Sequence, residues 1–166
     1  MGRFVLLSAI LLTVLSSCGG DTQEFVDRAT LLNEPAARLR FPGSVELAHV
    51  GAERVTTVEG PQSAFDGYIL GSDADADEIH SYYARELERL GWQRDLIAGV
   101  KSTAEIEAWG WCRGRIDYRL AIKDAQRAFQ PGFYGGRTFR TVFDARLVSR
   151  RLSTPCPYAP SRSPTR

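Results

Sequence analysis

Two segments, 115–123 and 138–149, alternate hydrophobic and polar residues at every second position. In the first, the hydrophobic positions are Ile116, Tyr118, Leu120 and Ile122, and the polar ones are Arg115, Asp117, Arg119 and Lys123. In the second, the hydrophobic-facing positions are Phe139, Thr141, Phe143, Ala145 and Leu147, and the polar ones are Arg140, Asp144 and Arg146. This pattern predicts two antiparallel strands, each with one face in the core and one in water. Residues 124–137, which contain four glycines or prolines, predict a long hairpin loop between them.

Residues 74–90 have the periodicity of a helix. The hydrophobic positions Ile79, Tyr82, Tyr83, Leu87 and Leu90 fall on one stripe of a helical surface. Asp75 with Glu78 three residues later fits a capping box, and Gly91 stands where a left-handed C-terminal cap belongs. We therefore predict one amphipathic helix that packs by this stripe on one face of the sheet.

The acidic residues at the start of this helix also resemble part of a calcium-binding loop. Asp73, Asp75 and Asp77 match the first, third and fifth positions of an EF-hand. However, Glu78 occupies the position that requires glycine, and Ala84 the position of the bidentate acid. The acidic run is therefore interpreted as helix capping, because negative charge stabilises the N-terminal end of a helix.

The remaining pattern is weaker but consistent with more strands. Residues 45–58 and 64–70 predict a pair of strands joined by a turn at Gly60-Pro61. Residues 92–97 predict a short strand, and residues 105–112 fit either a strand or a helix. The prediction is a single α+β domain over residues 41–158, with a mostly antiparallel sheet of four or five strands and the helix on one face.

The N-terminal end has the layout of an export signal. Arg3 precedes the apolar run 4–15, which is too short to span a bilayer, since a spanning helix needs about 20 apolar residues. Leu15-Ser16-Ser17-Cys18 resembles the bacterial lipobox. The resemblance implies that residues 1–17 are cleaved off and that Cys18 carries a diacylglyceryl thioether, which gives the lipid chains that stable anchoring requires. The alternative is an ordinary secretory signal with an incidental cysteine.

These assignments predict where the protein resides and how its ends behave. The protein is exported and anchored by its lipid, which includes palmitate-type acyl chains, to the outer face of the plasma membrane or to the outer membrane of a diderm cell. Residues 18–40 are expected to be a tether that contains a short helix between residues 24 and 39. Residues 159–166 are expected to be a disordered tail.

Two further cysteines, Cys112 and Cys156, remain once Cys18 is assigned to lipid. Exported proteins tolerate disulfides, so we expect these two to be joined, which would stabilise the fold by about 4 kcal/mol in the loop-entropy model. Two free thiols are the alternative. Metal binding is not expected, because His49 and His80 show no zinc-ligand spacing.

Several of these motifs occur together in a known group of proteins. Phe41-Pro42-Gly43-Ser44, a strand pair, and a helix with Tyr82-Tyr83 and Leu87 that stops at Gly91-Trp92 resemble a family of uncharacterised bacterial lipoproteins. The resemblance covers about residues 41–149. It implies an architecture and an envelope location, but no agreed activity and no catalytic residues. Tyr82 departs from the family pattern, where phenylalanine is more usual.

Charge and motifs exclude several functions. With 21 basic and 20 acidic residues, the chain has no electrostatic footprint for nucleic acid. It has no nucleophile elbow, no His-Glu zinc motif and no glycine-rich phosphate loop, so we expect no catalysis, cofactor or metal. A small hydrolase is the alternative. Ser81 and His80 are adjacent on the helix, so their side chains diverge.

A binding or interaction role at the envelope is therefore the functional prediction, with a glycan or another envelope protein as partner besides the membrane. In an extended segment, Trp109, Trp111, Arg113 and Arg115 share one face and would form a platform for sugar rings or an anionic polymer. The alternative is that both tryptophans belong to the core around Cys112. The loop aromatics Phe129, Phe133 and Tyr134 present the same choice between core and surface, and they are predicted to contact a partner or the membrane.

Overall fold

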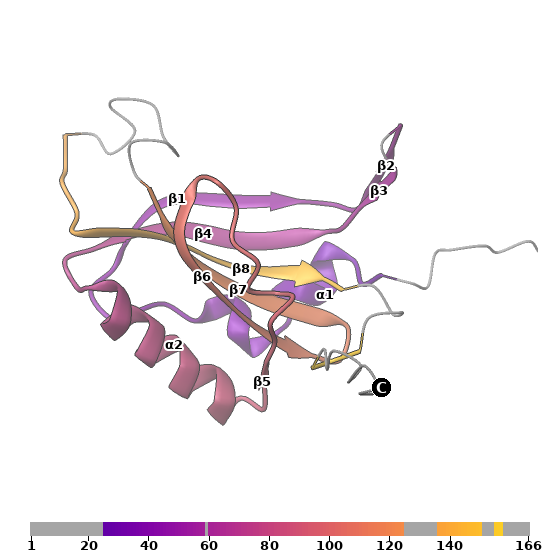
Figure 1. Cartoon of the computed structure of the whole chain (residues 1–166). Helices are drawn as coiled ribbons and strands as arrows, with labels where there is room; N and C mark the ends of the chain where they lie inside the picture. The colour runs from indigo at the N-terminus through magenta and orange to yellow at the C-terminus, as the bar shows by residue number, and fades with distance from the viewer. Residues whose placement is uncertain (1–24, 59, 125–135, 151–154, 158–166) are drawn as a thin grey trace, which may run out of the picture.

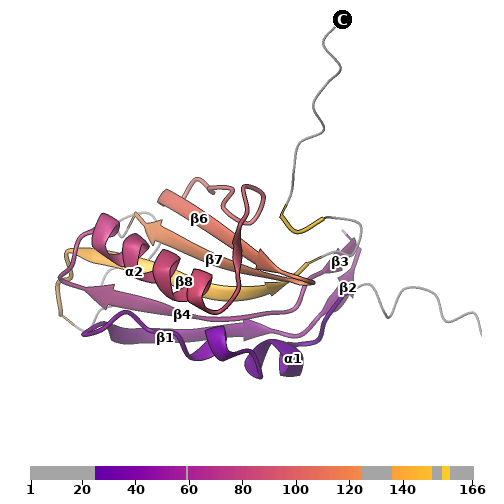
Figure 2. The ribbon, with the colours of Figure 1, turned by 90° about the horizontal axis from the view of Figure 1, so that it is seen from below.

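The computed structural model describes residues 25–58, 60–124, 136–150 and 155–157, which form an antiparallel sheet with one long helix across one face (Figures 1 and 2). The helices are α1 (Arg28–Leu32), the 3-10 helix η1 (Pro35–Arg38) and α2 (Ala76–Arg89). The main sheet has the spatial order β1-β4-β8-β7-β6-β5 and contains β1 (Val45–Ala52), β4 (Phe65–Ser72), β5 (Gln93–Arg94), β6 (Glu105–Arg113), β7 (Ile116–Lys123) and β8 (Thr141–Ser149). A separate pair consists of β2 (Val55–Thr57) and β3 (Gly60–Gln62).

The predicted α+β class is confirmed, but the predicted count of four or five strands is wrong, because the main sheet has six. The ambiguous segment 105–112 is strand β6, in which Trp109 and Trp111 pair with residues of β7. The edge strand β5 falls within the short strand predicted over residues 92–97; it is only two residues long and pairs with the end of β6. Gly91, with φ of 82°, ends α2 and turns the chain back towards that edge.

Helix α2 provides the core on the face of the sheet that it covers, which we call the helix face. Ile79, Tyr83 and Leu87 of α2 are fully buried. The Tyr83 ring lies 5.8 Å from that of Tyr118 on β7 and 6.1 Å from that of Phe143 on β8, measured between centroids. The capping interpretation of the acidic run is confirmed, because the side chain of Asp75 accepts a hydrogen bond of 2.9 Å from the Glu78 backbone N–H.

The predicted alternation of hydrophobic and polar residues along β7 and β8 is confirmed for the positions that face the core. Those that pack on the helix face are Ile116, Tyr118, Leu120, Ile122, Phe143, Ala145 and Leu147. The opposite face differs from the prediction that it would be simply wet, because Asp144 is only 1% exposed. Its carboxylate accepts a hydrogen bond from Arg146, with which it also forms an ion pair. A second ion pair joins it to Lys123, whose Nζ lies 3.2 Å away.

Buried ion pairs continue from Lys123 across this opposite face. Glu105 accepts hydrogen bonds from Arg119 and Lys123, each 2.8 Å to Oε1. Burial alone would raise the pKa of Glu105, but these two hydrogen bonds hold it well below its ordinary value. Charges on this face are thus paired within the sheet, because the strand register sets opposite charges side by side.

The predicted tether of residues 18–40 is too long, because the chain is fixed to the sheet from Phe25 onward. The backbone N–H of Val26 donates a 2.9 Å hydrogen bond to the Ser149 hydroxyl. Arg28 at the start of α1 forms an ion pair of 2.7 Å with the buried carboxylate of Asp66. Leu31 and Ala36, in α1 and η1, are buried in the core. The predicted short helix is therefore part of the domain rather than of a flexible linker.

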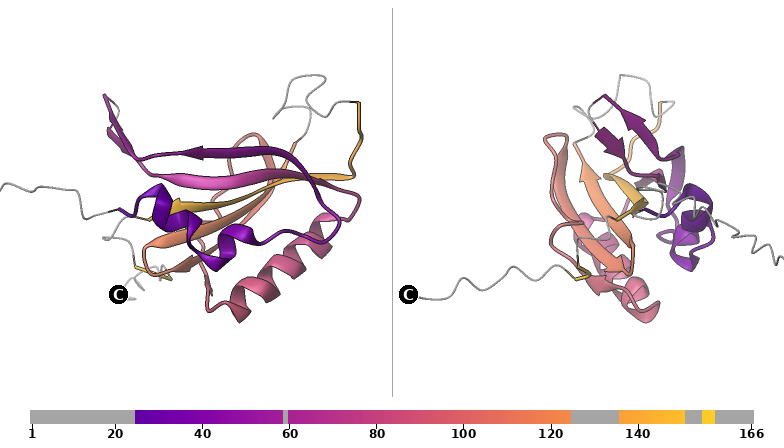
Figure 3. Two further views of the ribbon diagram at one scale, coloured as in Figure 1. Left: turned by 180° about the vertical axis from the view of Figure 1, so that it is seen from behind. Right: turned by 90° about the vertical axis from the view of Figure 1, so that its right-hand side faces the viewer.

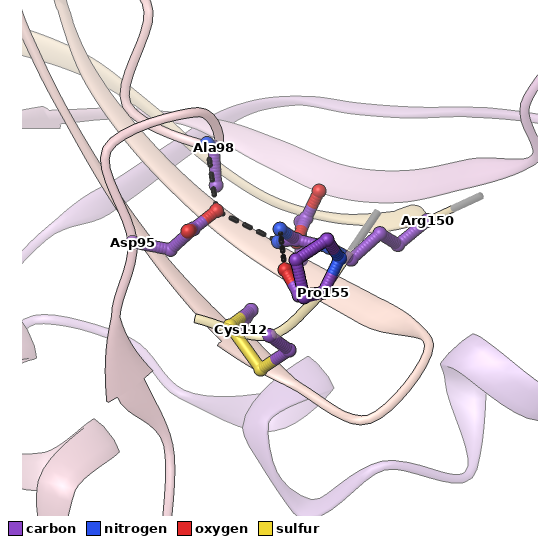
Figure 4. The surroundings of a disulfide bond; sticks show 7 residues. Asp95, Ala98, Cys112, Arg150 and Pro155 are labelled. Carbon is purple, nitrogen blue, oxygen red and sulfur yellow. Dashed lines mark hydrogen bonds and ion pairs between the residues drawn. A yellow bond between two sulfur atoms is a disulfide. The ribbon is translucent and has the colours of Figure 1, made fainter. Parts of the chain in front are cut away.

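The C-terminal end is fixed by a disulfide and an arginine (Figure 4). Cys112 and Cys156 form the predicted disulfide, with a Cα–Cα distance of 5.8 Å. Arg150 is 3% exposed and forms ion pairs with Asp95 at 2.7 Å and with Asp117. The expectations for residues 1–17, Cys18 and the tail 159–166 lie outside the described residues.

Candidate functional site: a groove at the start of α2

A groove with a volume of about 700 Å³ lies beside the first turns of α2. Two other hollows have volumes of about 340 Å³ each. Three segments line the groove: the turn before β1, the connection from β4 to α2, and one face of α2. Its residues are Phe41, Pro42, Gly43, Ser72, Asp73, Ala74, Glu78, Ser81, Tyr82 and Arg85. Its size is within the range of about 300–1,000 Å³ that is typical of ligand sites.

The first wall is the turn Phe41–Ser44. The backbone N–H and the hydroxyl of Ser44 both donate to the carbonyl of Phe41, at 3.1 and 2.7 Å. Gly43 has φ of 75°, a conformation that other residues rarely adopt, and an added Cβ there would meet only open space. Glycine is therefore required by the backbone of the turn rather than by crowding.

The second wall is the connection from β4 to α2. The Ser72 hydroxyl accepts a 3.1 Å hydrogen bond from the backbone N–H of Ala74. The hydroxyl of Thr141 on β8 donates a 2.7 Å hydrogen bond to the Ala74 carbonyl. These bonds anchor the connection to the sheet, so the carboxylate of Asp73 next to it stays exposed at the rim.

The third wall is the face of α2 formed by Glu78, Ser81, Tyr82 and Arg85, which are three or four residues apart and therefore share one side of the helix. The Tyr82 ring packs edge-on against Phe41, with centroids 5.4 Å apart. The Arg85 guanidinium lies 5.7 Å from the Tyr82 ring centroid. Burial raises the pKa of Tyr82, with Glu86 adding to the rise, so its hydroxyl is a neutral donor at physiological pH.

The groove thus combines aromatic surface with hydrogen-bonding groups of both signs. Asp73 and Glu78 offer acceptors, Arg85 offers donors, and Ser81 offers both. His80, the neighbour of Ser81, lies on another side of the helix, where its ring stacks on Trp109 at a centroid distance of 4.4 Å. The predicted divergence of Ser81 and His80 is therefore confirmed, and the groove contains no histidine among its described lining residues.

The predicted tryptophan platform is not formed as expected. Trp109 and Trp111 do share one face of β6, but it is the helix face, and Trp111 is 0% exposed. The prediction of a surface ring is wrong for Trp111, because α2 and Arg94, 4.7 Å from the ring centroid, cover it. Trp109 is half-buried under His80.

Of the two arginines predicted beside the tryptophans, Arg113 is held through its side chain by other parts of the fold. Arg113 pairs with Glu34 and donates a 2.9 Å hydrogen bond to the Leu90 carbonyl. Arg115 lies after the turn at Gly114, and its backbone carbonyl accepts a hydrogen bond from Arg150. Phe129, Phe133 and Tyr134, the loop residues predicted to contact a partner or the membrane, lie outside the described residues.

Sequence reasoning missed the groove as a site. The residues that carried the family resemblance, Phe41-Pro42-Gly43 and Tyr82, line it, so that motif was the available signal. In the sequence alone they were interpreted only as a turn and a packing residue. The approach of a turn 40 residues away to the helix depends on the tertiary fold.

Within the described residues, no group of three or more His, Cys, Asp or Glu side chains could hold a metal ion. No helix in this part of the chain has the length and hydropathy to cross a membrane. The chain matches no family model, no curated protein and no solved structure. The groove therefore has to be interpreted from its own geometry and chemistry.

Proposed function

We propose that this protein is a membrane-anchored bacterial lipoprotein whose domain binds a ligand at the cell envelope through the groove beside α2 and catalyses no reaction. In this proposal Cys18 carries the lipid. The ligand is an envelope glycan, and it contacts the groove instead of the predicted tryptophan platform.

The position of the groove is the observation that carries the proposal. β1 runs from the groove, just after Ser44, to the end of the sheet where α1 lies (Figure 1). Its eight residues separate the two ends by about 26 Å at the usual rise per residue. A lipid on Cys18 would hold the α1 end near the membrane, so the groove would face away from it and stay accessible.

The lining of the groove supports a glycan as ligand. Aromatic side chains such as Tyr82 pack against the apolar faces of sugar rings, while carboxylates and guanidinium groups bind sugar hydroxyls. Asp73, Glu78 and Arg85 stand around the half-buried ring of Tyr82 in this way. The mixed signs of charge favour a neutral or zwitterionic ligand over a strongly anionic one.

Lipid attachment can be tested directly in living cells. Cultures that express the full chain are fed radioactive palmitate, with a Cys18→Ser variant as the control. We expect label in the parent chain and none in the variant, together with a mature N-terminus at residue 18. An unlabelled parent chain, or a different first residue, would contradict the anchor.

Ligand binding can be tested with the soluble chain from residue 18 onward carrying Cys18→Ser. Its binding to isolated cell-wall glycan and envelope polysaccharides is measured by co-sedimentation and calorimetry. Ser81→Trp fills the groove, whereas Glu88→Trp places the same ring on an exposed part of α2 outside it. We expect Ser81→Trp to weaken binding more than tenfold and Glu88→Trp to leave it unchanged. Equal effects of the two variants, or binding only to envelope proteins, would refute the glycan-binding groove.

A further inference from the structure

The charged side chains of the groove follow a fixed order along its length. Asp73 and Glu78 line the end where α2 begins, and Arg85 lines the groove seven residues after Glu78 on the same face of the helix. These two helical positions are separated by a rise of about 10 Å. Tyr82 lies between them on α2, and its ring packs on that of Phe41. The order along the groove is therefore carboxylate, aromatic ring and guanidinium.

The two carboxylates reach the same end of the groove from different segments. In the left view of Figure 3, the chain between η1 and β1 passes beside the start of α2, where the connection from β4 also arrives. Asp73 belongs to that connection, and Glu78 belongs to the first turn of α2. Two negative charges at one end of a groove favour a single cationic group of a ligand there.

Both carboxylates are available to a ligand in the described structure. The neighbouring acid, Asp75, is already engaged, because it accepts the capping hydrogen bond from the Glu78 backbone N–H and lies 3.8 Å from Nη2 of Arg140. The side chains of Asp73 and Glu78 are exposed, and in the described part of the chain neither has an ion-pair partner. The helix dipole by itself would favour an anion at this end, but the acidic first turn offsets it.

The guanidinium of Arg85 is available at the other end. Its Nε lies 3.6 Å from Oε1 of Glu86, but Glu86 makes a closer contact, of 3.0 Å, with Arg89. An exposed ion pair of this kind contributes little, so an oxyanion of a ligand can replace Glu86 beside Arg85 at small cost. A guanidinium binds a carboxylate through two parallel N–H donors, which also fixes the direction of the bound group.

We infer that the ligand of the groove is a zwitterionic amino-sugar glycan, with an ammonium group bound by Asp73 and Glu78, a sugar ring packed on Tyr82, and a carboxylate bound by Arg85. This inference rests on the proposed function, a glycan-binding groove, and adds the charge pattern of the ligand and its direction along the groove. A separation of about 10 Å is longer than one sugar ring, so the two charges belong to neighbouring sugars.

Ligands with a single sign of charge fit this order less well. A strongly anionic glycan would place an anion beside the two carboxylates, and a purely cationic chain would place an ammonium group beside Arg85. Like charges set side by side at an interface cost binding free energy. Charges at exposed positions affect specificity more than affinity, so the measurable consequence is a selection between ligands that differ in charge.

The test compares oligosaccharides of one length that differ in the charges they carry. Oligomers of alternating glucosamine and glucuronic acid carry both charges. Their N-acetylated form keeps only the carboxylates, and oligomers of glucosamine keep only the ammonium groups. Each is titrated by calorimetry into the soluble chain from residue 18 onward carrying Cys18→Ser, at low and at high salt.

We expect the zwitterionic oligomer to bind about fivefold more tightly than either of the other two at low salt. Asp73→Asn/Glu78→Gln should abolish its preference over the N-acetylated oligomer, and Arg85→Gln its preference over the glucosamine oligomer. The matched changes Glu88→Gln and Arg38→Gln, at exposed positions outside the groove, should alter neither preference. Salt screens charges, so both preferences should shrink at high salt, whereas a preference caused by the size of the acetyl group would not.

The inference and the proposed function fail separately. If the zwitterionic and N-acetylated oligomers bind equally and Ser81→Trp weakens both, the inference is overturned and the glycan-binding groove stands. A preference that survives Asp73→Asn/Glu78→Gln also overturns it, because the selecting groups then lie elsewhere. If none of the three oligomers binds the parent chain, the inference is again overturned, while the proposed function is decided by the isolated envelope glycans. Circular dichroism checks that each variant retains the fold.

Discussion

Replacing Arg150 by methionine is expected to destabilise the fold severely. The Arg150 side chain is 2% exposed and donates a hydrogen bond of 2.7 Å to Asp95, whose side chain is 0% exposed. It also pairs with Asp117 and donates to the carbonyl of Pro155, next to the disulfide (Figure 4). Burial alone would lower the pKa of Arg150, but the hydrogen bonds and charges of Asp95 and Asp117 raise it, so the guanidinium is firmly charged.

The magnitude follows from the two carboxylates that would lose this cation. Removing one partner of a buried ion pair costs about 3–5 kcal/mol, because the remaining charge stays desolvated. Domains of this size have about 5–15 kcal/mol of stability, so Arg150→Met should leave a marginally folded protein. Arg150→Met combined with Asp95→Asn should recover about 1–2 kcal/mol, since the amide removes the buried charge and its oxygen can still accept from the backbone N–H of Ala98.

The assay is urea unfolding of the disulfide-bonded proteins at pH 7 and at pH 4.5, followed by tryptophan fluorescence and circular dichroism. Burial already raises the pKa of Asp117, and without Arg150 it should rise further. A carboxyl whose pKa is higher in the folded than in the unfolded state favours folding most when it is protonated. The loss of unfolding free energy caused by Arg150→Met should therefore be smaller at pH 4.5 than at pH 7. A single variant within about 1 kcal/mol of the parent at pH 7, or a double variant no more stable than the single one, would refute the reasoning.

Three further predictions concern close packing, helix capping and pH. Gly110→Ala should cost about 1–3 kcal/mol in urea unfolding, because an added Cβ would lie 2.3 Å from the backbone carbon of Ala98; a loss under 0.5 kcal/mol would contradict it. Asp75→Ala should lower the free energy of unfolding by about 1 kcal/mol through loss of the N-cap, while the matched change Asp73→Ala should have little effect; equal losses would show that general acidity, not the cap, matters. Burial, followed by the charge of a neighbouring arginine, lowers the pKa of His80 below 6.5 in the folded state. The unfolded chain therefore binds a proton more readily, and stability should fall as the pH drops through about 6.5; His80→Gln should remove this part of the pH profile, and an unchanged profile would contradict the assignment.

The comparison of sequence and structure shows where local pattern is sufficient. The positions of α2, its cap at Asp75 and its end at Gly91 depend on residues within a few positions of one another, and the sequence predicted them. The core side of β7 and β8 was predicted for the same reason, since alternation is a local property of each strand. The disulfide was predicted by counting the cysteines that remain once Cys18 is assigned to lipid, in a compartment that was expected to tolerate disulfides.

The candidate site could be predicted only in part. Phe41-Pro42-Gly43 and Tyr82 were recognised as a motif, but the groove needs the contact of Phe41 with Tyr82 across 41 positions of sequence. The tryptophan platform was predicted from alternation alone, and alternation does not tell which face of a strand is covered. Trp111 lies under α2 because β6 pairs with β7 in the register that sets it beside Tyr118.

The sequence by itself determined the elements that short-range rules control: the helix with its caps and the alternating strands. It also predicted the pairing of Cys112 with Cys156, by counting cysteines rather than from local pattern. Only the tertiary structure decided how many strands join the sheet, that residues 25–40 belong to the domain, and that the groove and α1 lie at opposite ends. The physical reason is that these features arise from contacts between distant segments, whose energies depend on register, burial and charge pairing that no single stretch of sequence contains.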